Sequence, residues 1–173
     1  MIVVVAGVSG SGKSTVGSLL AGRLGWPFTD ADALHPAANI AKMRAGHPLS
    51  DADRRPWLAA VAGRMDEYAA AGEPAVLACS ALKRCYREEL LAGRPAARMV
   101  FLHATREMLE DRLRGRRGHF FPAALLDTQL ADLENPAPAE HVLVVEAAIP
   151  PDQAVDEIIR RLHLSAPRGK MSP

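Results

Sequence analysis

The sequence predicts an α/β fold in which a mainly parallel sheet is flanked by helices. Short apolar runs alternate along the chain with longer segments in which apolar residues recur every three or four positions. This alternation is typical of buried strands joined by crossover helices. The chain has 173 residues, a length that fits one domain, and it contains neither an internal repeat nor a low-complexity linker.

Five strands are expected, and each is a run short enough for a buried parallel strand. Ile2 to Ala6 is the clearest, because every residue in it is apolar. The other expected strands, in chain order, are Pro27 to Asp30, Ala75 to Cys79, Arg98 to Leu102, and His141 to Glu146.

Helices are expected between and after these strands, because apolar residues recur there at helical spacing. In chain order they cover residues 14–24, 36–46, 56–71, 82–92, 106–114, 123–133 and 151–162. The third shows the pattern best, since Trp57, Val61, Met65 and Tyr68 follow one another at steps of three or four. Residues 165–173 are polar, with two prolines and a glycine, and we expect a frayed tail there.

Two signals conflict at the start of the third helix. Ser50 followed by Asp53 resembles a capping box, which would begin the helix immediately. Pro56 lacks an N–H group, however, and is disfavoured deep inside a helix. We therefore expect Asp51 to Arg55 to form a separate turn, with Pro56 as the first helical residue.

A phosphate-binding motif follows the first strand. Gly7-Val8-Ser9-Gly10-Ser11-Gly12-Lys13-Ser14 matches the P-loop pattern G-x-x-x-x-G-K-[ST]. Glycines permit backbone angles that a Cβ would forbid, so successive N–H groups can surround an anion. Lys13 can reach the β- and γ-phosphates, and the Ser14 hydroxyl can ligate Mg²⁺. With a strand before it and a helix dipole after it, the segment through Thr15 predicts nucleotide binding rather than an accidental Gly/Ser turn.

Two carboxylates lie at the end of the second strand, where ligands of parallel sheets bind. The alternation in Asp30-Ala31-Asp32 predicts that both leave the strand on one side. One could hold a magnesium-bound water, and the other could accept the proton of a hydroxyl that attacks the γ-phosphate. The spacing alone fits a solvated Asp turn or a helix cap equally well.

Basic residues gather at three further places. Arg112, Arg114, Arg116 and Arg117 surround Gly115 and Gly118. Arginines there could stabilise a transferring phosphoryl group, and the glycines suit a segment that opens and closes, although a solvated helix end is the alternative. Lys83, Arg84 and Arg87 follow the third strand, and Arg54 and Arg55 precede Pro56. Each of these is most simply surface charge, but together they could bind an acidic substrate.

Composition excludes several classes of protein. Lys and Arg total 21 against 20 Asp and Glu, and this near balance argues against a general nucleic-acid-binding surface. The apolar runs are far too short to span a bilayer, so no membrane contact is expected. Two cysteines do not make a disulfide framework, which favours a reducing cytoplasm. The third and fourth strands end in Cys79-Ser80 and Leu102-His103, without the acid of a Walker-B motif, which disfavours a motor ATPase or GTPase.

Taken together, the motifs resemble those of the small P-loop gluconokinases, from residue 1 to about residue 160. Besides the P-loop, the matching stretches are Asp30 to Pro36, Asn39 to Met43, Gly46 to Leu58, Cys79 to Arg87, and Arg116 to Phe121, with Leu125, Leu126 and Gln129 shortly after. Pro-Trp-Leu, Cys-Ser-Ala-Leu-Lys and Gly-His-Phe within them are much more specific than the P-loop. Arg117 is a departure, because relatives often have lysine there.

The resemblance implies that ATP and D-gluconate react to give ADP and 6-phosphogluconate, with Mg²⁺. It implies a fold like those of nucleoside monophosphate kinases and shikimate kinase, with a five-stranded parallel sheet and a mobile lid, and it suggests a homodimer. On this basis residues 1–164 form a single kinase domain. The lid corresponds to about 114–121 and the substrate-binding region to about 35–57.

Roles for individual residues follow from the motifs and the resemblance together. Lys13, Asp32 and Arg116 are the expected catalytic residues. The nucleotide is bound by residues 7–15, Arg112 and Arg116, and the metal by Ser14 and, through water, Asp30. The expected gluconate-binding residues are Asp32, His35, Arg54, Lys83, Arg87 and His119.

Two alternatives remain open from the sequence. One is a P-loop kinase that acts on another small acid, such as shikimate, or on a nucleotide. The other is a nucleotide-responsive binding protein without fast turnover. The acidic pair and the arginines favour an enzyme, because a binding protein needs neither a base nor transition-state charge.

Replacing Arg116 with alanine tests the lid prediction. We expect Arg116→Ala to lower kcat more than it weakens ATP binding, because the guanidinium is best used on the charge of the transition state. Arg116→Lys should rescue only partly, since an ammonium lacks the guanidinium fork. Steady-state kinetics and nucleotide affinity measure both effects. Weaker ATP binding with unchanged kcat would instead make Arg116 a ground-state clamp.

Overall fold

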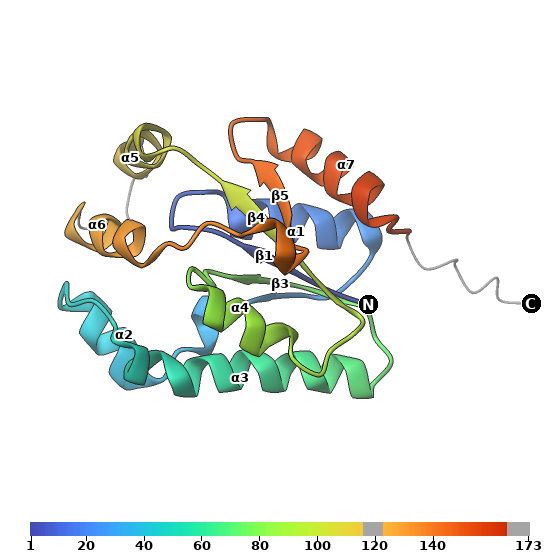
Figure 1. Ribbon diagram of the computed structural model, residues 1–173, viewed down its shortest axis with the longest axis horizontal. Helices are drawn as coiled ribbons and strands as arrows, with labels where there is room; N and C mark the ends of the chain where they lie inside the picture. Colours follow the sequence, from blue (N-terminus) through green and yellow to red (C-terminus); the bar gives the residue numbers. More distant parts are fainter. Residues whose placement is uncertain (116–122, 166–173) are drawn as a thin grey trace, which may run out of the picture.

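The computed structural model describes residues 1–115 and 123–165, which form a parallel sheet with helices on both faces (Figure 1). Its strands are β1 (Ile2–Ala6), β2 (Phe28–Asp30), β3 (Ala75–Cys79), β4 (Ala97–His103) and β5 (Leu143–Glu146). They lie in the order β2-β3-β1-β4-β5, and every neighbouring pair is parallel. The predicted fold class and all five strands are confirmed. β1 and β3 have the predicted bounds, and the ends of the other strands differ by at most two residues.

The helices also occur where the apolar spacing predicted them. They are α1 (Lys13–Leu24), α2 (Ala37–Arg44), α3 (Asp51–Ala70), α4 (Arg84–Leu91), α5 (Arg106–Gly115), α6 (Ala123–Asp132) and α7 (Pro151–Leu162). Two short 3₁₀ helices, η1 (Ala31–Leu34) and η2 (Pro138–Glu140), were not predicted. The expected tail, except for Ser165, and most of the expected lid, including Arg116, Arg117 and His119, lie outside the described residues.

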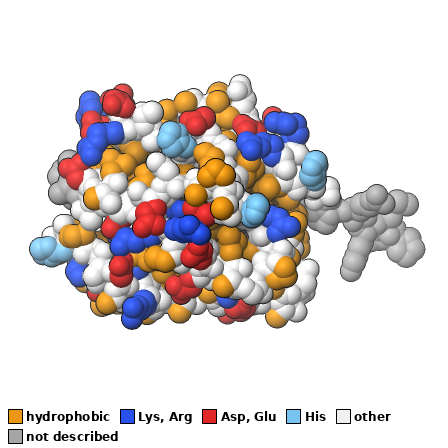
Figure 2. Space-filling model, viewed as in Figure 1, with side chains coloured by type: hydrophobic (Ala, Val, Ile, Leu, Met, Phe, Trp, Pro, Cys, Tyr) orange, Lys and Arg blue, Asp and Glu red, His pale blue; other side chains and the backbone are white. Residues whose placement is uncertain are grey.

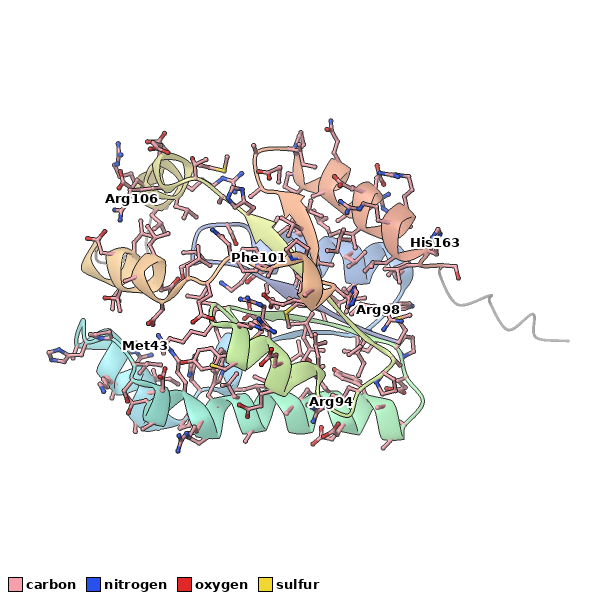
Figure 3. All side chains as sticks on the ribbon, in the orientation of Figure 1. Met43, Arg94, Arg98, Phe101, Arg106 and His163 are labelled. Atoms are coloured by element: carbon pink, nitrogen blue, oxygen red, sulfur yellow. The ribbon has the colours of Figure 1, made fainter. Side chains whose placement is uncertain are left out.

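The two faces of the sheet are covered by different helices. Because side chains alternate along a strand, Val4 of β1 packs with α3 and α4 on one face, whereas Val3 and Val5 pack with α1 and α7 on the other. Phe101, labelled at the centre of Figure 3, belongs to the first of these cores. Burial on both faces explains why β1 is apolar throughout.

Three helices surround the carboxyl ends of the strands. Figure 1 shows α2, α5 and α6 at the same end of the molecule, and Met43 of α2 and Arg106 of α5 are both labelled there in Figure 3. A small apolar cluster of Val8, Leu82, Leu109 and Leu126 joins α5 and α6 to the loops that follow β1 and β3. This cluster fixes α6 beside the predicted P-loop.

The expected turn before Pro56 is wrong, because α3 begins at Asp51 and continues through the proline. The capping box forms, with Ser50 accepting from the Asp53 N–H and the Asp53 side chain accepting from the Ser50 N–H. Lys42 also holds the Asp53 carboxylate, at 2.6 Å. Pro56 deprives the carbonyl of Ala52 of a helical partner, but Ala52 and Pro56 are both exposed, so water can hydrate that carbonyl.

The surface carries no strong bias of charge on the face that Figure 2 shows, where Lys and Arg side chains are interspersed with Asp and Glu. None of the helices in the described ranges is both long and apolar enough to cross a membrane. Cys79 is buried at the end of β3, and burial raises the pKa of its thiol to about 12, whereas Cys85 on α4 is exposed.

Pro56→Ala should stabilise the protein by about 1 kcal/mol, because it restores a helical hydrogen bond and removes the ring, with a partial offset from greater freedom of the unfolded chain. Gly63→Ala in the same helix is a matched control. A Cβ at Gly63 meets no atom within 4 Å, so this variant reports helix propensity alone. Urea unfolding measures both. A loss of stability in Pro56→Ala would mean that the proline is needed for the start of α3.

Candidate functional site

The loop between β1 and α1 has the backbone shape of an anion-binding site. Gly7, Gly10 and Gly12 have φ angles of 148°, 89° and 97°, which side chains rarely permit. A Cβ at Gly7 would lie 2.6 Å from the Ser11 Oγ. Lys13, the first residue of α1, is buried beside this loop, so its ammonium belongs to the site and not to the surface. The loop therefore combines a helix N-terminus with a buried cation.

Asp30 connects this loop to β2. The Ser14 hydroxyl donates to Asp30 Oδ2 at 2.6 Å, and Asp30 Oδ1 accepts from the Asp32 N–H at 3.0 Å, which caps η1. The strand ends at Asp30, so Asp32 belongs to a 3₁₀ helix, and the period-two argument for its direction is wrong. Both acids nevertheless reach the site, and Asp30 acts in part as the cap that the sequence left open.

The Asp32 carboxylate is available for chemistry. Asp32 lines a cavity of about 190 Å³ together with Lys13, His35 and Arg54. Its carboxylate makes no hydrogen bond or ion pair with any described residue, unlike that of Asp30. The cavity thus brings Lys13, His35 and Arg54, all predicted site residues, together around the unengaged carboxylate of Asp32.

Arg54 is held at one wall of this cavity by a network of charges. Its Nη1 donates to Asp132 at 2.8 Å and to the Tyr86 hydroxyl at 3.3 Å. Lys83, also predicted as a substrate ligand, lies outside the cavity lining and pairs with Asp51 at 2.7 Å. That hydrogen bond raises the pKa of Lys83, and burial, followed by the hydrogen bond to Asp51, raises the pKa of Tyr86. Lys83 is thus engaged beside the cavity, whereas Arg54, like Lys13, lines it.

His35 offers a neutral ring to the cavity. It stacks on Trp57 with ring centroids 4.5 Å apart, and Trp57 is fixed by donating its indole N–H to the Ala31 carbonyl at 2.7 Å. Burial, together with the charge of Arg54, lowers the pKa of His35 although Asp32 opposes the shift. A neutral imidazole can both donate and accept hydrogen bonds, which suits hydroxyl groups.

Arg112 of α5 holds the loop between β1 and α1 by hydrogen bonds to the backbone. Its Nη1 donates to the Ser11 carbonyl at 3.0 Å and its Nη2 to the Ala147 carbonyl at 2.6 Å. It also lines a second cavity, of about 320 Å³, whose apolar lining includes Val16, Ile149 and Pro151. This position places Arg112 beside the loop that is predicted to bind the nucleotide.

Arg87 does not lie where the sequence prediction placed it. Its side chain is 1% exposed, and it donates to Glu140 through Nε at 2.7 Å and Nη2 at 3.0 Å. Its Nη1 donates to the Leu82 carbonyl at 2.8 Å. Every nitrogen of the guanidinium is therefore engaged inside the protein, so Arg87 is a structural residue in this arrangement and not a substrate ligand.

Several cavity residues were missed by the sequence analysis. Trp57 was interpreted as part of a helical apolar pattern and as the end of the expected substrate-binding region, without a role of its own, and Gln129 only as part of a resemblance. Thr128 also lines the cavity, and Asp132 lies behind Arg54. The i, i+4 relation of Thr128 and Asp132 was readable from the sequence, but nothing indicated which face of the helix points inward.

Comparisons with known proteins show which proteins this chain resembles. A family model described as an AAA domain matches residues 2–136. A gluconokinase of Gluconobacter oxydans (strain 621H) is 51% identical over 158 residues, which cover 91% of this chain and 89% of that protein. The crystal structure of a gluconokinase from Sinorhizobium meliloti 1021 has a TM-score of 0.80 at 44% identity, covering 93% of this chain and 94% of that one. A shikimate kinase from Bacteroides thetaiotaomicron, with a TM-score of 0.69 at 19% identity over 95% of this chain and 99% of its own, shares the fold.

Glu140→Gln tests the structural role of Arg87. Because the change leaves a buried guanidinium without its counter-charge, we expect a loss of roughly 3–5 kcal/mol in the free energy of unfolding. Glu88→Gln, which breaks the exposed pair with Arg84, is the control and should have no resolvable effect. If Glu140→Gln keeps its stability but raises KM for the acceptor substrate, Arg87 is a ligand after all.

Proposed function

The chain belongs to the gluconokinase family, and we propose that it transfers the γ-phosphoryl group of ATP to D-gluconate, giving ADP and 6-phospho-D-gluconate. The observation that carries this conclusion is identity of 51% over nearly the whole chain with a gluconokinase, combined with one cavity that joins Lys13 and Asp32 to Arg54. The alternative acceptors are not favoured, since the likeness to shikimate kinase at 19% identity extends to the fold alone.

The phosphates of ATP are assigned to the backbone N–H groups of residues 7–15 and to Lys13. The positive φ angles of the loop glycines and the burial of Lys13 support this role. We assign the adenine base of ATP to the second cavity, where the guanidinium of Arg112 and the apolar side chains of Ile149 and Pro151 could cover an aromatic ring.

Mg²⁺ fits the oxygen atoms of two side chains, Ser14 after the phosphate loop and Asp30 at the end of β2. Ser14 and Asp30 supply hard oxygen ligands 2.6 Å apart, and no cluster of three or more His, Cys, Asp or Glu suited to a metal occurs among the described residues. Mg²⁺ needs only one or two ligands from the protein, because it keeps several of its waters and also binds the phosphates of the substrate. We propose that Ser14 contacts the ion and that Asp30 does so through water. When bound, the ion neutralises charge on the phosphates.

Asp32 is the proposed general base. The acceptor hydroxyl transfers its proton to the Asp32 carboxylate while its oxygen bonds to the γ-phosphorus, and the bond from that phosphorus to the bridging oxygen of ADP breaks. The unengaged carboxylate in the cavity supports this role. Arg116, outside the described residues, is retained as the proposed catalytic arginine on the evidence of its sequence.

Recognition of the acid is assigned to Arg54, with His35 for the hydroxyl groups. A carboxylate needs a charged donor, and a buried guanidinium supplies one with directional N–H groups. Lys83 is now proposed to act by holding Asp51 and Asp132 near Arg54 and not by direct contact. His119 stays a proposed ligand from the family resemblance alone.

We further propose the remaining features that the family resemblance implies. These are a homodimer in the cytoplasm, one kinase domain over residues 1–164 with a lid at about 114–121 and a substrate region at about 35–57, and a flexible tail at 165–173.

A panel of sugar acids tests the proposed reaction. We expect ATP-dependent phosphorylation of D-gluconate at O6, located by ³¹P and ¹³C NMR, with much lower kcat/KM for shikimate and for nucleoside monophosphates. Glucose is the matched control for the carboxylate, because it lacks the charge that Arg54 is assigned to bind. Equal turnover of glucose and gluconate would contradict that assignment, and turnover of neither would contradict the function.

Asp32→Asn should lower kcat by about 10²-fold or more, the usual contribution of a general base, because it preserves shape and removes the proton acceptor. Asp30→Asn should act mainly on the Mg²⁺ concentration required for activity. Both are compared by kinetics at varied Mg²⁺. An almost silent Asp32→Asn with a severe Asp30→Asn would mean that the two roles are reversed.

A further inference from the structure

Helix α6 contacts both halves of the active site through two side chains that lie one turn apart. Gln129 and Asp132 are related by i, i+3 and so occupy one face of the helix. Gln129 binds the phosphate loop, and Asp132 binds the wall of the cavity formed by α3 and the residues that precede α4. The function assigned above gives Gln129 no role and names Asp132 only as a partner of Lys83 beside Arg54.

The contact of Gln129 with the phosphate loop is reciprocal. Its Oε1 accepts from the Ser9 N–H at 2.8 Å, and its Nε2 donates to the Ser9 Oγ at 3.0 Å. Two hydrogen bonds between one amide and one residue fix both the position and the orientation of Ser9. Both residues also line the cavity, so a ligand there lies against this pair.

Asp132 orients Arg54 in the wall of the cavity. It accepts from Arg54 Nη1 at 2.8 Å and lies 3.5 Å from Lys83 Nζ. The Arg54 side chain is only 13% exposed, and its Nε and Nη2 make no hydrogen bond to any described residue. Because Asp132 binds Nη1, the edge formed by Nε and Nη2 remains available to a ligand. A carboxylate suits this edge, since it accepts two parallel N–H hydrogen bonds.

These polar contacts are not needed to attach the helix. Leu126 of α6 is buried in the apolar cluster with Val8, Leu82 and Leu109, which secures α6 independently. Gln129 and Asp132 therefore add polar contacts to a helix that apolar packing already holds. Gln129 contacts the phosphate loop, and Asp132 contacts Arg54.

We propose that α6 couples the acid subsite to the phosphate loop, with Asp132 as the positioning residue of Arg54 and Gln129 as that of Ser9. A carboxylate that binds Arg54 restrains Asp132 and hence the face of α6 that holds Ser9. Binding of one substrate then increases the affinity for the other, and linkage requires the effect to be reciprocal. The inference rests on the proposed function, because it takes gluconate as the ligand of Arg54.

The test is a comparison of binding, by calorimetry, in the full-length protein. The affinity for a non-hydrolysable ATP analogue with Mg²⁺ is measured with and without saturating gluconate, and the ratio is the coupling factor. We expect a factor of about 5 or more in the unaltered protein, within the usual range for linked sites. Gln129→Met and Asp132→Asn should each bring it close to 1. The double variant should lose no more than either single variant, because both interrupt one connection.

Asp127→Asn is the matched control, since Asp127 lies on the same helix but pairs with Arg106 at the surface and should leave the factor unchanged. Gln129→Ala is a second variant in case Gln129→Met does not fold, as judged by circular dichroism. Asp132→Asn should also raise KM for gluconate. If its only role were charge, removing a negative group beside Arg54 would lower that KM, and this result would overturn the proposal.

A coupling factor that persists in both single variants would also overturn the proposal, leaving α6 a packing element. Failure of the proposed function is separate and visible in the unaltered protein, which would then bind the ATP analogue without binding or phosphorylating gluconate. In that case gluconate is not the ligand of Arg54, and the coupling to it fails as well.

Discussion

The position of β1 at the centre of the sheet is the constraint on which the site depends. β1 is paired with β3 on one side and β4 on the other, and its residues are buried on both faces. The loop that follows it therefore starts from a backbone that is hydrogen-bonded on both sides. This anchoring reduces the conformational entropy that its glycines lose when they adopt their unusual angles. The loops after β2 and β3 are then placed against a fixed anion site.

The positive charge of Arg54 and Lys83 is balanced by neighbouring carboxylates within the protein. Arg54 and Lys83 each lie within ion-pair distance of both Asp51 and Asp132, and the Tyr86 hydroxyl also donates to Asp51, so two cations face two carboxylates. Two neighbouring cations without such partners would repel one another and attract any anion. Internal carboxylates reduce that general attraction and fix the direction of the remaining donors, which favours a ligand with matching geometry.

The sequence predicted the strands and the phosphate loop well because these depend on local information. An uninterrupted apolar run such as that of β1 has few alternatives, and the loop motif specifies its own backbone. Prediction from sequence failed where tertiary contacts decide the bounds of an element or the partner of a side chain. Pro56 was expected to start a helix, but an earlier cap and an exposed carbonyl allow it inside one. The direction of Asp32 was inferred from strand alternation, but the strand ends at Asp30 and Asp32 belongs to a 3₁₀ helix. Arg87 was expected to face a ligand, yet its partner Glu140 lies 53 residues further along the chain and no spacing rule connects them.

The contrast between the two thiols has a practical consequence. Cys79 ends a central strand and keeps its proton until about pH 12, so it resists alkylation and oxidation at neutral pH. Cys85 is exposed on α4 and directly precedes Tyr86, a residue of the cavity wall. A maleimide dye would therefore attach at a single place on the native chain, beside the site but outside it. The protein carries its own attachment point for a fluorescent reporter of ligand binding, with no substitution required.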